Sequence, residues 1–413
     1  MYLLVLCNIN MMNISIIGAG YVGLITGIGF AKLGNQVSII DLNGDLIQKL
    51  KKGIAPFYEP ELEEHFKKPD IFENMSFFNN YEESINKETD IIFVCVQTPT
   101  DFQSGRTDTK YLKNVLSKLN DFKEHNFSIC IKSTVNSKLI MNICKEIKVD
   151  YNKIIFNPEF LREGSALYDF FNPDRIVIGG SDENSIEKCL KLYDGFECEK
   201  IITDSTSSQI IKYLSNTYLA MRLSFVNETY KLSSDFGGNP NQILDAIGKD
   251  KRIGNHYFRP SPGWGGSCFP KDVKEVINFF DSEYQSPLIS KIIESNESHM
   301  DWFAEYLLLQ LNENNLRKVV LIGAPFKENT DDMRESPTLK IYDRIVKKFE
   351  NIFILDLNVK LNKEYKLLSS IEDLEKDTLY VEMFPDSSNE RLRLLEKINE
   401  LSNCSVVKIW ESS

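Results

Sequence analysis

The sequence predicts an α/β protein in which two doubly wound, largely parallel sheet units are joined by a region of long helices. Residues 13–42 and 318–358 each read as strand, turn, helix and strand, and residues 205–236 show helical spacing of apolar side chains. The chain has 413 residues, which at about 150 residues per domain corresponds to two or three domains. Each domain of that size can bury its own hydrophobic core.

The first unit begins with a complete strand–helix–strand pattern. Residues 13–42 contain a β-branched run, a glycine turn, a helical stretch that ends near Gly34 and a second β-branched run. Further strand-like runs follow, separated by helical or loop segments, at 91–96, 128–131, 154–156 and 176–178. This alternation predicts a largely parallel sheet that extends to about residue 200.

A long helix and a second strand pattern follow. Between 205 and 236 no proline or glycine interrupts the helical spacing of the apolar residues Ile210, Ile211, Leu214, Tyr218, Leu219, Met221, Phe225 and Val226. The strand pattern resumes at Lys318, and Pro337 opens a predicted helix over 336–349 before the run IFILDLN. This second unit reads as a degenerate repeat of the first that keeps only one turn glycine, Gly323, with convergent strand composition as the alternative. We therefore expect it to bind a different phosphate ligand.

Composition and charge exclude several classes of protein. Apolar residues make up 42% and charged residues 26%, as in ordinary globular proteins. Asp plus Glu outnumber Lys plus Arg by 60 to 48, a net charge of -12, so a nucleic acid partner is not expected. A small anionic ligand stays possible through backbone N–H groups and a few cations. No apolar run approaches the roughly 18 residues needed to cross a membrane.

Cysteine and histidine usage indicates neither a metal site nor a disulfide framework. The eight cysteines contain no C-x-x-C pair and the four histidines are scattered. Residues 1–10 lack the pattern of a signal peptide and read as an upstream start or a loose tail. These features predict a protein of the reducing cytoplasm.

Three glycines between a predicted strand and a predicted helix form a dinucleotide-binding pattern. Gly18, Gly20 and Gly23 permit a tight turn, close approach of a pyrophosphate and packing of the helix on the sheet. Asp41 ends the next strand, where a carboxylate can accept hydrogen bonds from a ribose and repels a 2'-phosphate. NAD is therefore favoured over NADP. A glycine turn in a sheet that binds nothing remains the alternative.

A second group of candidate residues surrounds one cysteine. Cys268 follows a glycine pair and precedes a predicted helix, and a thiol at a helix N-terminus can react as thiolate. The alternative is a buried apolar cysteine, which is the interpretation for Cys95 and Cys130 in their strands. Lys212 and Asn216 are four residues apart on the long helix and share a face, which by itself is typical of a solvated surface.

Several longer motifs resemble one enzyme family in the expected order. They are GAGYVGL (18–24), VQTPTD (96–101), KSTV (132–135), NPEFLREGSALYDFFNPDRIVIGG (157–180), IKYLSNTYLAMRLSFVNE (211–228), RIGNHYFRPSPGWGGSCFPKD (252–272) and FKENTDDMRESP (326–337). The chain resembles the UDP-glucose 6-dehydrogenases within the UDP-glucose/GDP-mannose dehydrogenase family. This implies two Rossmann-like doubly wound domains joined by a central long-helix dimerisation region. The implied boundaries are 1–202 for the NAD domain, 203–300 for the central domain and 301–413 for the UDP-sugar domain.

The resemblance also implies site residues, motif by motif. The implied catalytic residues are Cys268, Lys212, Asn216, Asp272, Glu159 and Thr134. The implied NAD contacts are Gly18, Gly20, Tyr21, Val22, Gly23, Asp41, Thr100, Thr134, Glu163 and Arg334. The implied UDP-glucose contacts are Glu159, Phe160, Leu161, Arg162, Glu163, Lys212, Asn216, Arg252, Tyr257, Phe258, Arg259, Pro260, Ser261, Gly265 and Lys327. Arg252 is expected to reach the neighbouring subunit of a homodimer.

Two positions and one segment depart from the family pattern. Asp45 stands where many relatives carry a basic residue near the adenosine, which puts that NAD contact in doubt. Trp264 replaces the usual tyrosine or phenylalanine of the glycine loop. From about residue 360 onward the match is loose, so no site residue is assigned there.

The implied reaction oxidises the C6 alcohol of UDP-glucose to a carboxylate and reduces two NAD. Cys268 would bind the aldehyde as a thiohemiacetal, which is oxidised to a thioester, while Lys212 and Asn216 stabilise the oxyanion. Either Asp272 or Glu159 would activate the hydrolytic water. The alternatives are another sugar nucleotide, namely GDP-mannose or a UDP-N-acetylhexosamine, and a non-catalytic NAD and nucleotide sensor. A two-electron hydroxyacid dehydrogenase would have no use for the GGSCFPKD loop.

Overall fold

The structure is a computed structural model that describes residues 11–99, 106–279, 286–359, 364–386 and 388–410. The prediction for residues 1–10 lies outside this part. The chain divides into two compact units, Met1–Leu214 and Ser215–Ser413, and the boundary falls within one long helix. Within the described residues no helix combines the length and apolarity that spanning a membrane requires.

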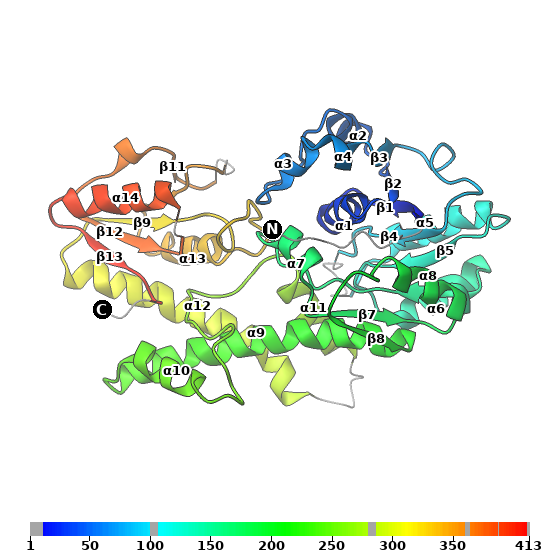
Figure 1. Cartoon of the computed structure of the whole chain (residues 1–413). Coiled ribbons are helices and arrows are strands. Elements are labelled where there is room, and N and C mark those ends of the chain that lie inside the picture. Colours follow the sequence, from blue (N-terminus) through cyan, green and yellow to red (C-terminus); the bar gives the residue numbers. More distant parts are fainter. Residues whose placement is uncertain (1–10, 100–105, 280–285, 360–363, 387, 411–413) are drawn as a thin grey trace. The chain divides into compact units, whose positions relative to one another are not determined.

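The first unit is built around a sheet of eight strands within the described residues, in the order β3-β2-β1-β4-β5-β6-β7-β8 (Figure 1). Its elements are β1 (Asn13–Ile17), α1 (Tyr21–Lys32), β2 (Gln36–Ile40), α2 (Gly44–Lys51), α3 (Leu62–Phe66), α4 (Pro69–Phe72), β3 (Met75–Phe78), β4 (Ile91–Val94), α5 (Lys110–Leu119), η1 (Asn120–Phe122), β5 (Ser128–Ile131), α6 (Ser137–Ile147), η2 (Tyr151–Lys153), β6 (Ile154–Phe156), α7 (Ala166–Phe171), β7 (Arg175–Gly179), α8 (Glu183–Lys191) and β8 (Glu199–Thr203). The first six strands have the order of a dinucleotide-binding sheet.

The second unit contains a parallel sheet of five described strands, in the order β11-β10-β9-β12-β13 (Figure 1). The helix α9 (Ser205–Asp235) crosses from the first unit into the second. The remaining elements are α10 (Pro240–Gly248), α11 (Phe269–Phe279), α12 (Pro287–Glu313), β9 (Lys318–Ile322), α13 (Pro337–Ile345), β10 (Ile352–Leu355), β11 (Leu367–Leu368), η3 (Ile371–Asp373), β12 (Thr378–Glu382), α14 (Asn389–Glu400) and β13 (Ser405–Val407).

Helices cover both faces of the first sheet, because residues of one strand pack into two different hydrophobic clusters. Ile14 and Ile16 of β1 belong to the hydrophobic cluster that contains α1, whereas Ile17 belongs to the cluster that contains α5 and α6. In β4, Phe93 and Val94 divide between the same two clusters. A strand with both faces buried reads as a continuous apolar run, which is why these strands could be predicted. The prediction of an α/β, doubly wound fold is confirmed.

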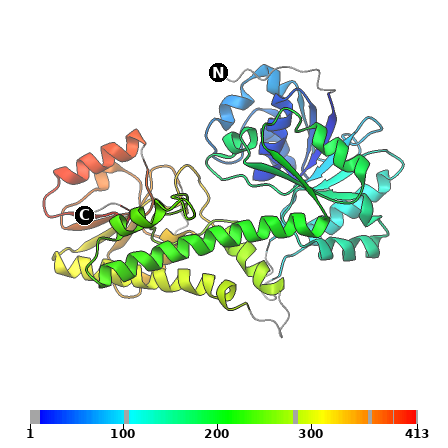
Figure 2. The same ribbon diagram turned by 60° about the horizontal axis from the view of Figure 1, so that its bottom comes forward.

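The structure adds detail that the sequence did not predict. β7 pairs with β6 in antiparallel orientation, through Phe156 and Gly179, so the last two strands run against the others. The short strands β3, β8, β12 and β13 and the long helix α12 were not among the predicted elements. Within the second unit, α9 from Ser215 onward runs beside α12 (Figure 2). The rings of Tyr230 on α9 and Trp302 on α12 lie with their centroids 6.2 Å apart.

Candidate active site

The glycine turn between β1 and α1 combines two crowded positions with one open position. A Cβ on Gly18, whose φ is +103°, would lie 2.8 Å from the carbonyl oxygen of Cys95. A Cβ on Gly23 would lie 1.9 Å from the carbonyl oxygen of Gly18. A Cβ on Gly20 would meet no protein atom within 4 Å. Packing therefore requires two of the glycines, and the third leaves space at the N-terminus of α1.

This open space fits the phosphates and ribose of a dinucleotide. Gly20 supplies no side-chain cap to α1, and the first turn, where Tyr21 and Val22 lie, contains no acidic residue, so its N–H groups can face an anion. Asp41, at the end of β2, accepts hydrogen bonds from the N–H groups of Ala19 at 2.9 Å and Asn43 at 2.9 Å. The carboxylate is thus held beside the turn. Asp45 lies in the first turn of α2, where a negative charge stabilises the helix.

In the second unit, an aspartate again accepts a hydrogen bond from a glycine turn, but no helix begins directly after this turn. Gly323 has a φ of +102°, and Asp356 accepts hydrogen bonds from Ala324 N–H at 2.8 Å and Asn358 N–H at 2.9 Å. However, α13 begins only at Pro337. A helix N-terminus therefore does not follow this turn directly, in keeping with the expectation of a different ligand.

Glu59 joins the glycine turn to the loop before α7, a role that sequence reasoning missed. Its buried carboxylate accepts hydrogen bonds from the Tyr21 hydroxyl, from Gly164 N–H at 2.7 Å and from Ala166 N–H at 2.7 Å. Burial, followed by the hydrogen bond to Glu59, raises the pKa of Tyr21. Glu59 lies in an irregular segment with no periodicity, so the sequence offered no signal for it.

A buried ion pair connects the next loop with α9. Lys212 Nζ lies 2.8 Å from Glu159 Oε1, and the two side chains are only 3% and 7% exposed. The other carboxylate oxygen of Glu159 accepts a hydrogen bond from Leu161 N–H at 2.7 Å. The Phe160 ring lies 5.5 Å from Lys212 Nζ and 3.9 Å from the Arg175 guanidinium. The structure thus brings together two of the predicted catalytic residues within the first unit.

The structure also shows the surroundings of other predicted site residues in the first unit. The Arg162 guanidinium binds Asp169 through two contacts of 2.6 and 3.0 Å. Glu163, in the loop before α7, is half-buried. The Thr134 carbonyl oxygen accepts a hydrogen bond from Thr98 Oγ1 at 2.9 Å. The prediction for Thr100 lies outside the described residues.

In the second unit, the candidate nucleophile lies one helical turn before an acidic residue that binds an amide. Cys268 directly precedes α11, and its carbonyl oxygen accepts a hydrogen bond from Asp272 N–H at 2.9 Å. The buried carboxylate of Asp272 accepts hydrogen bonds from Asn216 Nδ2 at 2.6 Å and from Lys271 Nζ at 2.6 Å. The Cys268 Sγ lies 3.6 Å from Ser267 Oγ. The structure therefore joins the side chains of Asp272 and Asn216, and Cys268 lies one helical turn before Asp272.

The environment of Cys268 differs from that of the strand cysteines. Cys95 and Cys130 are buried, as predicted, whereas Cys268 is partly exposed. Burial raises the pKa of Cys95 to about 12 and that of Cys130 well above its ordinary value. Those two thiols stay protonated at neutral pH and serve as core residues.

The loop before Cys268 contains most of the remaining predicted substrate residues. Arg252 is exposed and binds Asp250 at 2.6 Å, and the buried Phe258 ring lies 4.9 Å from the Arg222 guanidinium. Tyr257 is half-buried with a φ of +53°. Of the next residues in the loop, Arg259 is exposed, Pro260 is buried and Ser261 is half-buried.

Close backbone contacts hold the glycine pair of this loop against the segment before α13. A Cβ on Gly265 would lie 2.0 Å from the Glu335 carbonyl oxygen, and Gly266 N–H donates to the Arg334 carbonyl oxygen at 3.0 Å. The Arg334 guanidinium binds Asp332 at 2.7 Å. Lys327 Nζ lies 5.6 Å from the ring of its neighbour Phe326.

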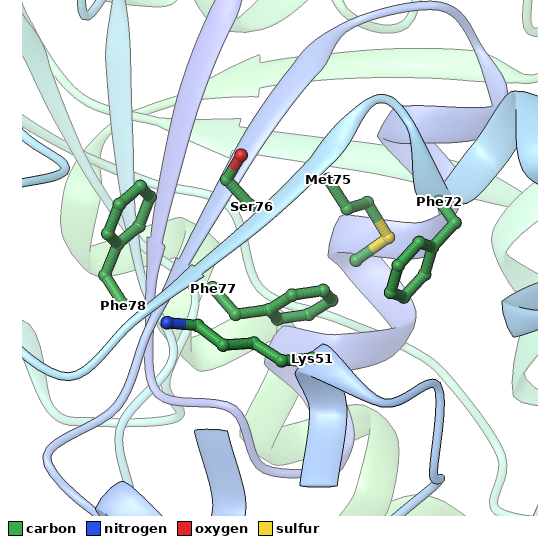
Figure 3. A pocket seen from close by; sticks show the side chains of 6 residues that line it. All are labelled: Lys51, Phe72, Met75, Ser76, Phe77 and Phe78. Atoms are coloured by element: carbon green, nitrogen blue, oxygen red, sulfur yellow. The ribbon is translucent and has the colours of Figure 1, made fainter. Parts of the chain in front are cut away.

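A surface hollow elsewhere in the first unit contains none of the predicted site residues. Its volume is about 310 Å³, and Figure 3 shows the side chains that line it, which are Lys51, Phe72, Met75, Ser76, Phe77 and Phe78. Four of them belong to β3, an edge strand of the sheet. The candidate site is therefore defined by its side-chain contacts and not by this hollow.

Fold and site together define a class of protein. A dinucleotide-type glycine turn with Asp41 in one unit, and a thiol at the start of a helix in the other, are features of a nucleotide-dependent dehydrogenase. Models of the UDP-glucose/GDP-mannose dehydrogenase family match residues 12–197 as NAD binding domain, 206–298 as central domain and 320–384 as UDP binding domain. The chain belongs to the UDP-glucose/GDP-mannose dehydrogenase family. It is an NAD-dependent oxidoreductase.

Individual relatives agree with this assignment. The chain is 34% identical to the UDP-glucose 6-dehydrogenase YwqF of Bacillus subtilis, over 81% of this chain and 77% of the relative. It is 35% identical to a UDP-glucose 6-dehydrogenase of Rickettsia felis, over 88% of this chain and 83% of the relative. A solved UDP-glucose dehydrogenase of the archaeon Pyrobaculum islandicum matches with a TM-score of 0.84 and 29% identity, over 98% of this chain and 99% of that one.

Proposed function

We propose that this protein oxidises UDP-glucose to UDP-glucuronate and reduces two NAD per turnover, with Cys268 as covalent nucleophile. The observation that carries the proposal is that Cys268 stands at the start of α11, one helical turn before Asp272, whose buried carboxylate accepts a hydrogen bond from Asn216. Oxidation of an alcohol to an acid needs a means of retaining the aldehyde, and a thiol provides it. The names of the relatives supply the substrate.

The chemistry at C6 divides between the cofactor and the residues of this chain. NAD, held at the glycine turn by Gly20 and Asp41, would supply a hydride acceptor for each of the two oxidations at C6. Cys268 Sγ adds to the aldehyde carbon and forms a thiohemiacetal, whose oxidation yields a thioester. Water then attacks this carbon, the carbon–sulfur bond breaks, and the thiol is restored with the carboxylate product.

Lys212 and Asn216 are proposed to stabilise the oxygen on C6 as it becomes negative. They lie four residues apart on α9, and each already donates to a buried carboxylate. These contacts hold the two donors in fixed positions, which avoids reorganisation when charge develops. Glu159 and Asp272 are the candidates for the base that activates water, because each is a buried carboxylate in contact with one of the donors.

Three domains, with boundaries at 202/203 and 300/301, are also proposed, and so is a homodimer. Support for the homodimer comes from a stripe of exposed apolar side chains on one side of α9, each 41% to 58% exposed: Ile210, Leu214, Tyr218, Phe225 and Leu232. A contiguous apolar stripe of this kind is typical of a helix that packs against a partner. The described cysteines are free thiols, which supports the proposed cytoplasmic location.

Arg252 is proposed to act in the site of the neighbouring subunit, since its side chain is 88% exposed. Subunits carrying Arg252→Ala and Cys268→Ala can be mixed to test this. A heterodimer would then contain one site with both residues, and an equal mixture should recover about a quarter of the wild-type activity. An inactive mixture would show that Arg252 acts within its own subunit.

The experiment that tests the proposed function is the ratio of NADH formed to UDP-glucose consumed by purified protein with excess NAD. We expect a ratio of two. A ratio of one would mean that the aldehyde is released and that the covalent role of Cys268 is wrong. Absence of NADH would direct the assay to GDP-mannose and the UDP-N-acetylhexosamines, and failure with all of them would favour the sensor.

A further inference from the structure

The loop Ser261–Gly266, which leads to Cys268, is attached to two helices by four buried polar side chains. Each of these side chains binds a polar group of Ser261 or Trp264. Two lie on α9 and two on α12, and all are at most 6% exposed: Ser224, Asn227, Asn296 and His299. Burying polar groups is unfavourable unless each one is hydrogen-bonded, so such a concentration around one loop requires an explanation.

Asn296 makes the most specific of these attachments. Its Oδ1 accepts a hydrogen bond from Trp264 N–H at 3.0 Å, and its Nδ2 donates to the Trp264 carbonyl oxygen at 2.9 Å. A side-chain amide can satisfy both backbone groups of one residue because it carries a donor and an acceptor side by side. Aspartate and leucine cannot do this, since a carboxylate only accepts and an alkyl group does neither.

The other three side chains fix the two ends of the same short segment. Asn227 Oδ1 accepts from Ser261 N–H at 2.9 Å, and His299 Nε2 lies 2.8 Å from the Ser261 carbonyl oxygen. Ser224 Oγ accepts from the Trp264 indole N–H at 2.9 Å. Both backbone polar groups of Ser261 and of Trp264 are thus bound by side chains of α9 or α12.

Close packing restricts the loop from other directions as well. A Cβ on Gly263 would lie 2.8 Å from Met300 Cγ, and the backbone of Gly265 and Gly266 packs on residues 334–335. The family resemblance implies that Ser261 and Gly265 contact the substrate, and Cys268 stands three residues after Gly265. The attachments therefore hold both a proposed binding loop and the approach to the nucleophile.

We propose that Asn296 is a positioning residue for the sugar nucleotide, acting through the backbone of Trp264 and not by contact with substrate. This inference rests on the proposed function, because it requires UDP-glucose as substrate, and on the family resemblance, which implies that Ser261 and Gly265 of this loop contact it. It predicts that loss of the hydrogen bonds between Asn296 and Trp264 weakens sugar-nucleotide binding specifically. NAD binding, which is assigned to the glycine turn of the first unit, should not change.

Asn296→Asp tests the proposal, with Asn312→Asp as matched control. The aspartate keeps the acceptor for Trp264 N–H but places an oxygen against the Trp264 carbonyl oxygen. Asn312 lies on the same helix and is exposed, so its replacement adds the same charge without touching the loop. The measurements are calorimetric Kd values for UDP-glucose and NAD, steady-state KM and kcat, and thermal unfolding.

We expect Asn296→Asp to raise the Kd and KM for UDP-glucose about tenfold, with values for NAD and for the Asn312→Asp control unchanged. A merely structural role would lower kcat through loss of folded enzyme and leave both KM values unchanged. That outcome, or an unaltered Kd for UDP-glucose, would overturn the proposal.

A second variant keeps the test decisive if Asn296→Asp does not fold. Ser224→Ala removes the partner of the Trp264 indole, and we expect an increase of about threefold in the same Kd. The wild-type protein separates this inference from the proposed function. If it prefers another sugar nucleotide, the comparison is repeated with that nucleotide, and if it binds none, both proposals are wrong.

Discussion

Gly20→Ala should weaken NAD binding while leaving the fold intact, because the open position of the glycine turn faces the ligand and not the protein. Gly20 has φ −74° and ψ −171°, a backbone conformation that alanine adopts readily. The new Cβ would meet no protein atom within 4 Å. We therefore expect a loss of unfolding free energy below about 1 kcal/mol, the usual cost of alanine at a helix N-cap.

The loss of cofactor affinity should be larger. The added methyl group occupies space that a pyrophosphate needs to reach the N–H groups of α1. Loss of one hydrogen bond to a charged group costs about 1.5–3 kcal/mol, so the Kd for NAD should rise by a factor of about ten to a hundred. Calorimetric titration with NAD measures this change, and thermal unfolding measures stability.

Two further glycines provide the controls. Gly23→Ala would place a Cβ 1.9 Å from the Gly18 carbonyl oxygen, so it should destabilise the first unit by about 3 kcal/mol or more. Gly44→Ala, at the start of α2, meets only Asn79 Nδ2 at 3.9 Å and should change neither property. Wild-type affinity for NAD in Gly20→Ala, or unfolding comparable to that of Gly23→Ala, would refute the reasoning.

Three other predictions concern single side chains. Cys268→Ser should bind NAD normally yet lose UDP-glucuronate formation, because serine is a poorer nucleophile; normal product formation would contradict the covalent role. Glu59→Gln should lower the unfolding free energy by about 1–3 kcal/mol, since an amide cannot accept from all three donors, and denaturant titration measures this. Burial lowers the pKa of His299 to about 4, below the value of about 6.5 in the unfolded chain. The unfolded state therefore binds more protons between these values, so stability should fall as the pH drops from about 6.5 to 4, and His299→Gln should flatten this dependence.

Much of the first unit could be predicted because its signals are local. The strands around the glycine turn are buried on both faces and read as continuous apolar runs, which periodicity detects. Gly18, Gly20, Gly23 and Asp41 lie within one strand–helix–strand unit, so their spacing carried the dinucleotide prediction. By contrast, spacing alone could not decide whether Cys268 is a nucleophile or a core residue. Only the longer motifs favoured a nucleophile.

The sequence by itself thus determined the fold class, the dinucleotide turn and the order of the motifs, because each depends on residues close together in the chain. Only the tertiary structure decided which side chains meet. Glu59 binds backbone groups 105 and 107 residues away, and Asn296 binds Trp264 from 32 residues away. Such pairs have no local pattern, since a buried polar group is satisfied by whichever partner folding brings within hydrogen-bond distance.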